Sequence, residues 1–259
     1  MTRKQQLALW RSNNRRQLGY RRKGRMMFSK AFDDQVRPLF DKLNETSDIR
    51  DFDIPALNNV VIESAYNKLY QLTARDFAIS KRKELKDVKS EDDIFDSIIR
   101  SEITAYVQQN TASMITVVGD TSLKLLQDMV KNLTVDIIDQ GIGGGEAVTM
   151  LRDQIQSGWH EIKRYRVERI IRTEVNRAAN FGSYKGAENI GMMIERVWMS
   201  AFAAESRSEH MAANGQAVKM DEPFIVGGDS LLFPGDVSLG ASAGNTINCL
   251  CSMFERPVK

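Results

Sequence analysis

The chain has 259 residues, of which 42% are hydrophobic and 27% charged, and its formal net charge at pH 7 is +2. These values are ordinary for a globular protein of one or two domains with a hydrophobic core. No run of about 18 apolar residues is present, which argues against a membrane span. The basic N-terminus has no apolar segment behind it, which argues against a secretory signal. Its two cysteines, one residue apart, do not make a disulfide framework, so a reducing compartment is the simpler interpretation.

The first 30 residues differ from the rest in charge. They contain ten Lys and Arg residues and no Asp or Glu, so the rest of the chain carries a net charge of −8. Basic side chains neutralise phosphates, and the interleaved aromatic residues can stack on bases. We therefore predict a basic arm over residues 1–30 that contacts DNA or an acidic protein surface. The alternative is a solvated arm that becomes ordered only in an assembly. The candidate contact residues are Arg11, Arg15, Arg16, Arg21, Arg22, Lys23 and Arg25.

Residues 31–118 form a predicted helical region. Apolar residues recur at spacings of three and four over residues 30–44 and 55–83, and again from Ile94 to Val107. Residues 101–119 are richer in Thr, Val and Ile, and their pattern does not distinguish helix from strand.

Residues 119–197 are predicted to be the helical part of a C-terminal domain. A strongly apolar helix ends at the glycine run 141–145, which we interpret as a helix–helix connector because it lacks the features of a phosphate loop. A short helix is predicted over residues 146–157, followed by a link that holds Trp159 and His160. The longest helix is predicted over residues 161–190.

From Trp198 onward the pattern changes to strands and turns. Short apolar runs such as Phe224 to Val226 are bounded by Gly, Pro, Asn and Asp. Asn214-Gly215 suits a tight turn that requires positive φ. The predicted fold class is therefore α+β, with a mostly helical N-terminal two-thirds and a small β-rich C-terminal part over residues 198–259.

Six short motifs follow one another in this last region, and a helical block precedes them. The block runs from Arg169-Ile170-Ile171-Arg172-Thr173-Glu174 to Ala178-Ala179-Asn180. No single motif is specific, but the ordered set resembles the Mu F-like phage head morphogenesis family over roughly residues 120–252. The six motifs are Trp198, Arg207-x-x-His210, Asn214-Gly215-Gln216, Asp221-Glu222-Pro223-Phe224, Pro234-Gly235-Asp236 and Ile247-Asn248-Cys249-x-Cys251.

The resemblance implies a minor head protein that accompanies the phage portal. Such a protein acts in head assembly and in DNA packaging or delivery, and it acts by binding, so we expect no enzymatic activity. The expected partners are the portal protein, and also packaged DNA and the major capsid or scaffold protein, with no membrane. The expected location is the virion, in the capsid interior or at the portal vertex, and the host cytoplasm during assembly.

The same region holds the candidate metal ligands His210, Cys249 and Cys251, and Asp221 or Asp236 would complete a zinc set. Against a metal, neither a C-x-x-C nor an H-x-x-x-H spacing is present. We expect no cofactor, with zinc as the alternative.

Two other functions remain open at this point. One is a metal- or Cys/His-dependent enzyme that uses the C-terminal cluster. Some relatives carry catalytic domains behind the motifs, and only eight residues follow Cys251 here, so such an enzyme would have to use the cluster itself. The other is a non-specific DNA-binding protein that acts through the arm.

Overall fold

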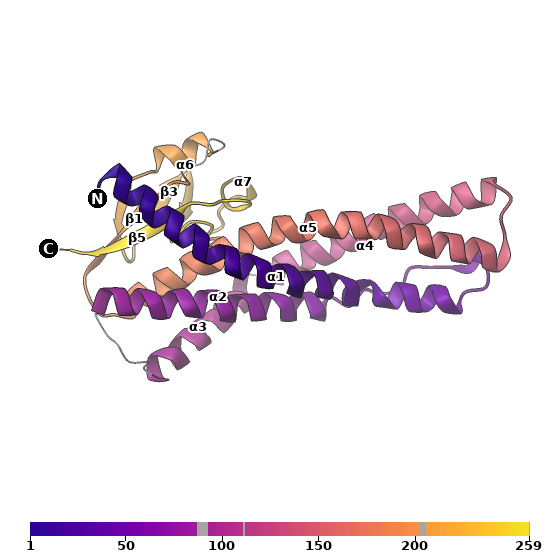
Figure 1. The fold of residues 1–259 in the computed structure, drawn as a ribbon, viewed down its shortest axis with the longest axis horizontal. Helices are drawn as coiled ribbons and strands as arrows, with labels where there is room; N and C mark the ends of the chain where they lie inside the picture. The colour runs from indigo at the N-terminus through magenta and orange to yellow at the C-terminus, as the bar shows by residue number, and fades with distance from the viewer. Residues whose placement is uncertain (87–92, 111, 202–205, 259) are drawn as a thin grey trace. The chain divides into compact units, whose positions relative to one another are not determined.

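A computed structural model describes residues 1–86, 93–110, 112–201 and 206–258. Long helices precede the strands along the chain (Figure 1). The helices are α1 (Arg3–Glu45), η1 (Ile49–Asp51), α2 (Val60–Lys86), α3 (Asp93–Asn110), α4 (Ala112–Asp139), α5 (Gly144–Glu188), α6 (Ser208–Ala212) and α7 (Ala243–Thr246). The strands are β1 (Ile194–Met199), β2 (Ala217–Lys219), β3 (Phe224–Val226), β4 (Asp229–Leu231) and β5 (Ser252–Pro257).

The chain divides into two compact units. The first contains Met1–Arg25, Asn67–Asn110 and Arg169–Lys259. The second contains Met26–Tyr66 and Thr111–Glu168. Helices α1, α2 and α5 each contribute one part to the first unit and another part to the second.

The strands of the first unit form a three-stranded antiparallel sheet of order β2-β1-β5 and a separate hairpin of β3 and β4. Strand β1 is central, and its residues are almost all buried, including Trp198. In the hairpin, Val226 pairs with Asp229, and the two residues between them are Gly227 and Gly228, which both have positive φ. That conformation matches the twist of the paired strands and is open to glycine at little cost.

The helices of the first unit pack through aromatic and very small residues. Tyr106 stacks on Phe181 with ring centroids 4.2 Å apart. A Cβ atom added at Gly182 would lie 2.1 Å from the carbonyl oxygen of Ala74. One added at Gly186, one turn later, would lie 2.5 Å from the carbonyl oxygen of Ala78. These two glycines therefore let α5 approach the backbone of α2 more closely than any other residue would allow.

Residues 1–25 belong to the body of the first unit, whereas the sequence predicted an arm over residues 1–30. The indole nitrogen of Trp10 donates to the carbonyl oxygen of Leu250, and the buried Gln17 donates to Asn176 Oδ1. At Gly24 an added Cβ would lie 2.7 Å from the Ile171 side chain. The N-terminal part of α1 therefore has a buried face made of polar and small residues. The basic composition of this segment does not predict such a face.

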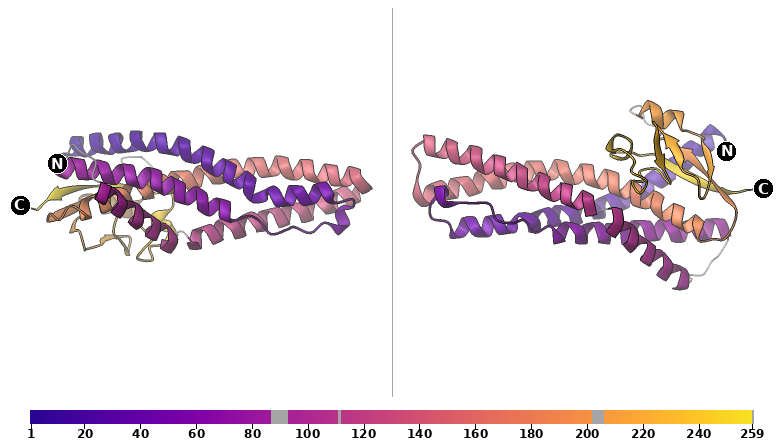
Figure 2. Two further views of the ribbon diagram at one scale, coloured as in Figure 1. Left: turned by 90° about the horizontal axis from the view of Figure 1, so that it is seen from below. Right: turned by 180° about the vertical axis from the view of Figure 1, so that it is seen from behind.

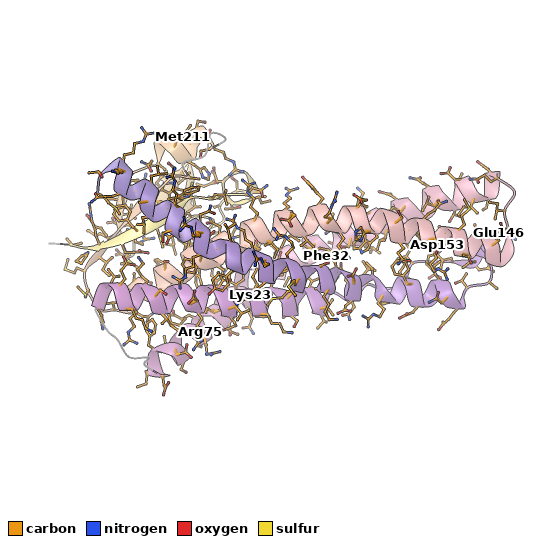
Figure 3. All side chains as sticks on the ribbon, in the orientation of Figure 1. Lys23, Phe32, Arg75, Glu146, Asp153 and Met211 are labelled. Carbon is orange, nitrogen blue, oxygen red and sulfur yellow. The ribbon has the colours of Figure 1, made fainter. Side chains whose placement is uncertain are left out.

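The second unit is a bundle of helices with a polar network inside it. Phe32 lies in this bundle (Figure 3), 6.0 Å from the Trp159 ring, and the guanidinium of Arg166 lies over the Phe32 ring. Arg166 donates to Ser122 Oγ at 2.7 Å, and Ser122 donates in turn to Gln35 Oε1. The views in Figure 2 agree that α4 runs alongside the first part of α5.

The α+β fold class predicted from the sequence is confirmed, but one predicted helix break is wrong. Helix α5 runs without interruption from Gly144 to Glu188, through the link that was predicted around Trp159. The reason is burial: Trp159 is only 3% exposed, so it packs in the bundle as a core residue of the helix. None of the helices in the described part of the chain is long and apolar enough to cross a membrane.

Candidate functional site

His210, Cys249 and Cys251 converge in the first unit. His210 lies on α6, next to the exposed Met211 that is labelled in Figure 3, and the two cysteines lie between α7 and β5. All three side chains are buried, with exposed fractions of 2–3%, and their ligand atoms lie within 4.8 Å of one another. His210 Nδ1 is 3.3 Å from Cys251 Sγ and 3.6 Å from Cys249 Sγ.

The orientation of the His210 ring is fixed from its other side. Its Nε2 lies 3.3 Å from Asn245 Oδ1. The amide nitrogen of Asn245 donates to the carbonyl oxygen of Val226 at 3.0 Å and to Asp229 Oδ2 at 2.7 Å. Because these two bonds use the amide NH₂, Oδ1 faces the histidine and accepts a hydrogen bond from the Nε2–H group. The lone pair of Nδ1 therefore points towards the two sulfur atoms.

The environments of the two thiols shift their pKa values in opposite directions. Hydrogen bonding with Cys251 lowers the pKa of the Cys249 thiol below its usual range, and the neighbouring His210 ring adds to this effect, against the opposing effect of burial. The hydrogen bond with Cys249 and burial raise the pKa of Cys251 well above its usual range. The two cysteines therefore differ in acidity, and Cys249 is the more acidic thiol.

Side chains of α5 hold the cysteine segment in place. The carbonyl oxygen of Cys251 accepts hydrogen bonds from Asn176 and Asn180, each at 3.0 Å. Asn180 also donates to the carbonyl oxygen of Pro234. Asn248 has a φ of 58°, and its amide donates to Thr173 Oγ1. The helix thus satisfies backbone groups of two separate loops, as buried polar side chains generally must.

A buried ion pair lies beside these contacts. Arg177 and Glu174 are almost completely buried, with a closest N–O distance of 2.7 Å. Arg177 Nε donates to the carbonyl oxygen of Gly235, and the hydroxyl of Tyr70 donates to Glu174. Asp236 accepts from the amides of Leu232 and Ser238, so it closes its own turn and does not reach the His–Cys cluster.

A pocket of about 270 Å³ opens onto the three ligand candidates. Its other lining residues include Arg172, Arg207 and Asn248. Arg207 is fixed by a hydrogen bond to the carbonyl oxygen of Ile247 at 2.7 Å. The pocket wall therefore combines soft ligand atoms with positive charge.

Comparison with known proteins decides the family. Residues 128–254 match the family model described as Phage Mu protein F like protein. The chain belongs to this family. The match covers about half of the chain and includes every motif from the α5 block to the two cysteines. The protein is thus a phage head morphogenesis protein, and the family indicates the virion capsid as its location.

A further relative of this Mu F-like protein is an NAD(+)--arginine ADP-ribosyltransferase, EFV, from Enterococcus faecalis. The two are 25% identical over 138 residues, which is 51% of this chain but only 27% of the relative. The chain therefore spans about a quarter of the length of that relative. No solved structure matches the chain.

The family motifs build the framework around the cluster. The Trp198 ring lies edge-on to His210 at 5.9 Å and to Phe224 at 5.3 Å. The side chain of Gln216 makes two hydrogen bonds to the backbone of Ile225 and so joins the hairpin to the sheet. Gly215, with a φ of 85°, forms the tight turn expected there. Most of the motifs thus position His210 and the cysteines and add no further ligand to them. Asp221, a candidate fourth ligand from the sequence, is exposed.

The predicted contact residues of α1 lie on different sides of that helix. Arg16 donates to Asp76 and Ser80, so it is a structural residue of the first unit. Arg21 is half-buried and donates to Gln17. The remaining predicted residues are exposed: Arg11, Arg15, Arg22, Lys23 and Arg25.

Two residues of the site were not identified as functional from the sequence. Asn245 lies in the short helix α7, within a run of small residues that carries no motif, and only its contact with His210 shows its role. Arg177 lies inside the motif block, and only the structure shows that it is buried and paired with Glu174.

Proposed function

We propose that this head protein docks on an acidic surface of the phage portal through one face of α1. This face, the basic stripe, consists of Lys4, Arg11, Arg15, Arg22 and Arg25, which are all exposed. Packaged DNA would be a second partner of the same stripe, as would acidic surfaces of capsid or scaffold proteins. The protein then contributes to head assembly and to DNA packaging or delivery by binding.

The observation that carries this proposal is the alignment of the stripe. Its members are separated by three, four or seven residues, and α1 is continuous through all of them. At about 100° per residue these spacings put the five side chains on one face. The stripe is about 30 Å long at 1.5 Å per residue. A regular row of cations of this length suits an extended acidic surface.

The opposite face of α1 is buried, which favours a rigid docking surface and argues against a flexible basic tail. Because Trp10 and Gln17 attach α1 to the first unit, the stripe is held in a fixed geometry before a partner binds. Preorganised charges lose less conformational entropy on binding than a disordered basic tail does. This also means that deleting residues 1–30 would damage the fold, so substitutions are the better test.

The test is a triple variant, Arg11→Gln, Arg15→Gln and Arg22→Gln, in the full chain. Its binding to the portal protein of the same phage is measured by pull-down at low and high salt. We expect binding by the unchanged protein at low salt and a large loss in the variant. The matched control removes three exposed charges elsewhere, through Lys124→Gln, Lys131→Gln and Arg164→Gln, and keeps portal binding.

The same variants separate portal from DNA. Each phosphate contact contributes about 0.9 to the slope of log affinity against log salt. If DNA is the partner, the salt dependence of duplex-DNA affinity should be weaker in the stripe variant, with a slope smaller by about 2.7 for three lost contacts. That result, together with unchanged portal binding, would overturn portal docking. Equal portal binding by unchanged protein, stripe variant and control variant would overturn the role of the stripe.

A further inference from the structure

We propose that His210, Cys249 and Cys251 bind one zinc ion, with a fourth coordination position that opens into the adjoining pocket. The site is separate from the basic stripe, so it does not depend on the proposed docking. Three buried side chains with soft or borderline donor atoms are the kind of ligand set that zinc takes in proteins.

The distances fit a tetrahedral ion. With Zn–S bonds of about 2.3 Å and Zn–N bonds of about 2.0–2.1 Å, tetrahedral geometry puts a nitrogen and a sulfur ligand about 3.6 Å apart. The observed separations between His210 Nδ1 and the two sulfur atoms are 3.3 and 3.6 Å. The side chains therefore stand close to coordinating positions without rearrangement.

Hydrogen bonding alone does not satisfy this cluster. Nδ1 of His210 has one lone pair, and two sulfur atoms lie within reach of it. Only one thiol can donate to that lone pair at a time. A zinc ion accepts all three lone pairs at once and compensates the charge of two thiolates.

Asn245 provides the outer support that metal-bound histidines usually have. It accepts a hydrogen bond from the Nε2–H group of His210 and leaves Nδ1 as the coordinating nitrogen. Its own amide is held by Asp229, which in turn accepts two hydrogen bonds from Ser242. The ring orientation is thus determined through a chain of three residues.

The fourth position has no donor among the Cys, His, Asp and Glu side chains of the described residues, since the cluster there has three members. Asp236, the sequence candidate, is occupied in its own turn. The pocket leaves room for water at this position, and the cations Arg172 and Arg207 on its wall also favour an anionic ligand. The zinc would link α6 to the start of β5, next to the Cys251 carbonyl that α5 holds.

The test uses the full chain, purified under reducing conditions from zinc-containing medium. We expect about one zinc ion per chain by mass spectrometry of the metal content. Replacing zinc by Co²⁺ in chelator-treated protein should produce a thiolate-to-metal charge-transfer band. His210→Ala and Cys249→Ser should lose the band, and the second histidine provides the control, since His160→Ala should keep it.

Asn245→Leu separates positioning from ligation. It keeps all three ligands but removes the acceptor for Nε2, so zinc affinity measured against a competing chelator should fall roughly 10–100-fold. The proposal is overturned if the unsubstituted chain, with both thiols shown to be reduced, contains no zinc and gives no cobalt charge-transfer band. Zinc binding by folded Cys249→Ser with unaltered affinity would overturn it as well.

Discussion

Removing Arg177 should destabilise the first unit more than removing any exposed arginine. Arg177→Met keeps most of the side-chain volume but leaves Glu174 buried, with the Tyr70 hydroxyl as a remaining partner. It also removes the hydrogen bond to the carbonyl oxygen of Gly235. Breaking a buried ion pair from one side costs about 3–5 kcal/mol. At about 2–4 °C per kcal/mol, the melting temperature should fall by roughly 6–20 °C.

The measurement is thermal unfolding followed by near-ultraviolet circular dichroism. Arg164 and Glu161 provide a matched control, because they lie on the same helix at the same spacing but are 74% and 68% exposed. Arg164→Met should cost no more than about 0.5 kcal/mol. The double variant Arg177→Met with Glu174→Gln should recover part of the loss, because no charge is then buried alone. If Arg177→Met and Arg164→Met melt at the same temperature, the buried pair is not a stabilising contact.

Two further predictions concern close packing and pH. Gly182→Ala should lower the free energy of unfolding by about 1–3 kcal/mol, because the new Cβ atom would clash with the Ala74 carbonyl oxygen. At Gly19 no atom lies within 4 Å of an added Cβ, so Gly19→Ala should raise the free energy of unfolding by about 0.5–1 kcal/mol through its better helix propensity. Urea unfolding measures both changes. Burial and the hydrogen bond to Asp76 raise the pKa of Tyr20 to about 12. This stabilisation is complete below the unfolded pKa of about 10 and is lost as pH rises through about 12. The difference in free energy of unfolding between the unchanged protein and Tyr20→Phe should therefore become smaller between about pH 10 and pH 12. A difference that stays constant over this range would contradict the raised pKa of Tyr20.

The sequence predicted the strands and turns after Trp198 better than the burial of α1. The strands and turns after Trp198 follow from local chemistry, since Gly, Pro and Asn specify turns within a few residues. The buried face of α1 does not, because Gln17 and Gly24 pack against Asn176 and Ile171, which lie about 150 residues further along the chain. A periodic pattern of apolar residues cannot reveal a face made of glutamine and glycine.

The candidate site shows the same limit. His210, Cys249 and Cys251 are recognisable because their side chains are rare in this chain and chemically distinctive. Asn245 is one asparagine among many, and its role depends on the positions of Val226 and Asp229 in the hairpin. A residue that positions a candidate metal ligand is harder to predict than the ligand residue. Its role depends on where the fold places it and not on its residue type.

The partition of the chain between the units has a consequence for the order of folding during synthesis. The second unit is complete once residue 168 has left the ribosome, whereas the first combines residues 1–25 and 67–110 with residues 169–259. The hydrogen bond from Trp10 to Leu250 joins residues 240 positions apart. Contacts of such sequence separation form late, since their loop-closure entropy is lost before they contribute stability. The face of α1 that contacts Asn176 and Leu250 therefore stays uncovered until nearly the whole chain is made, although Arg16 can pair earlier with Asp76 of α2.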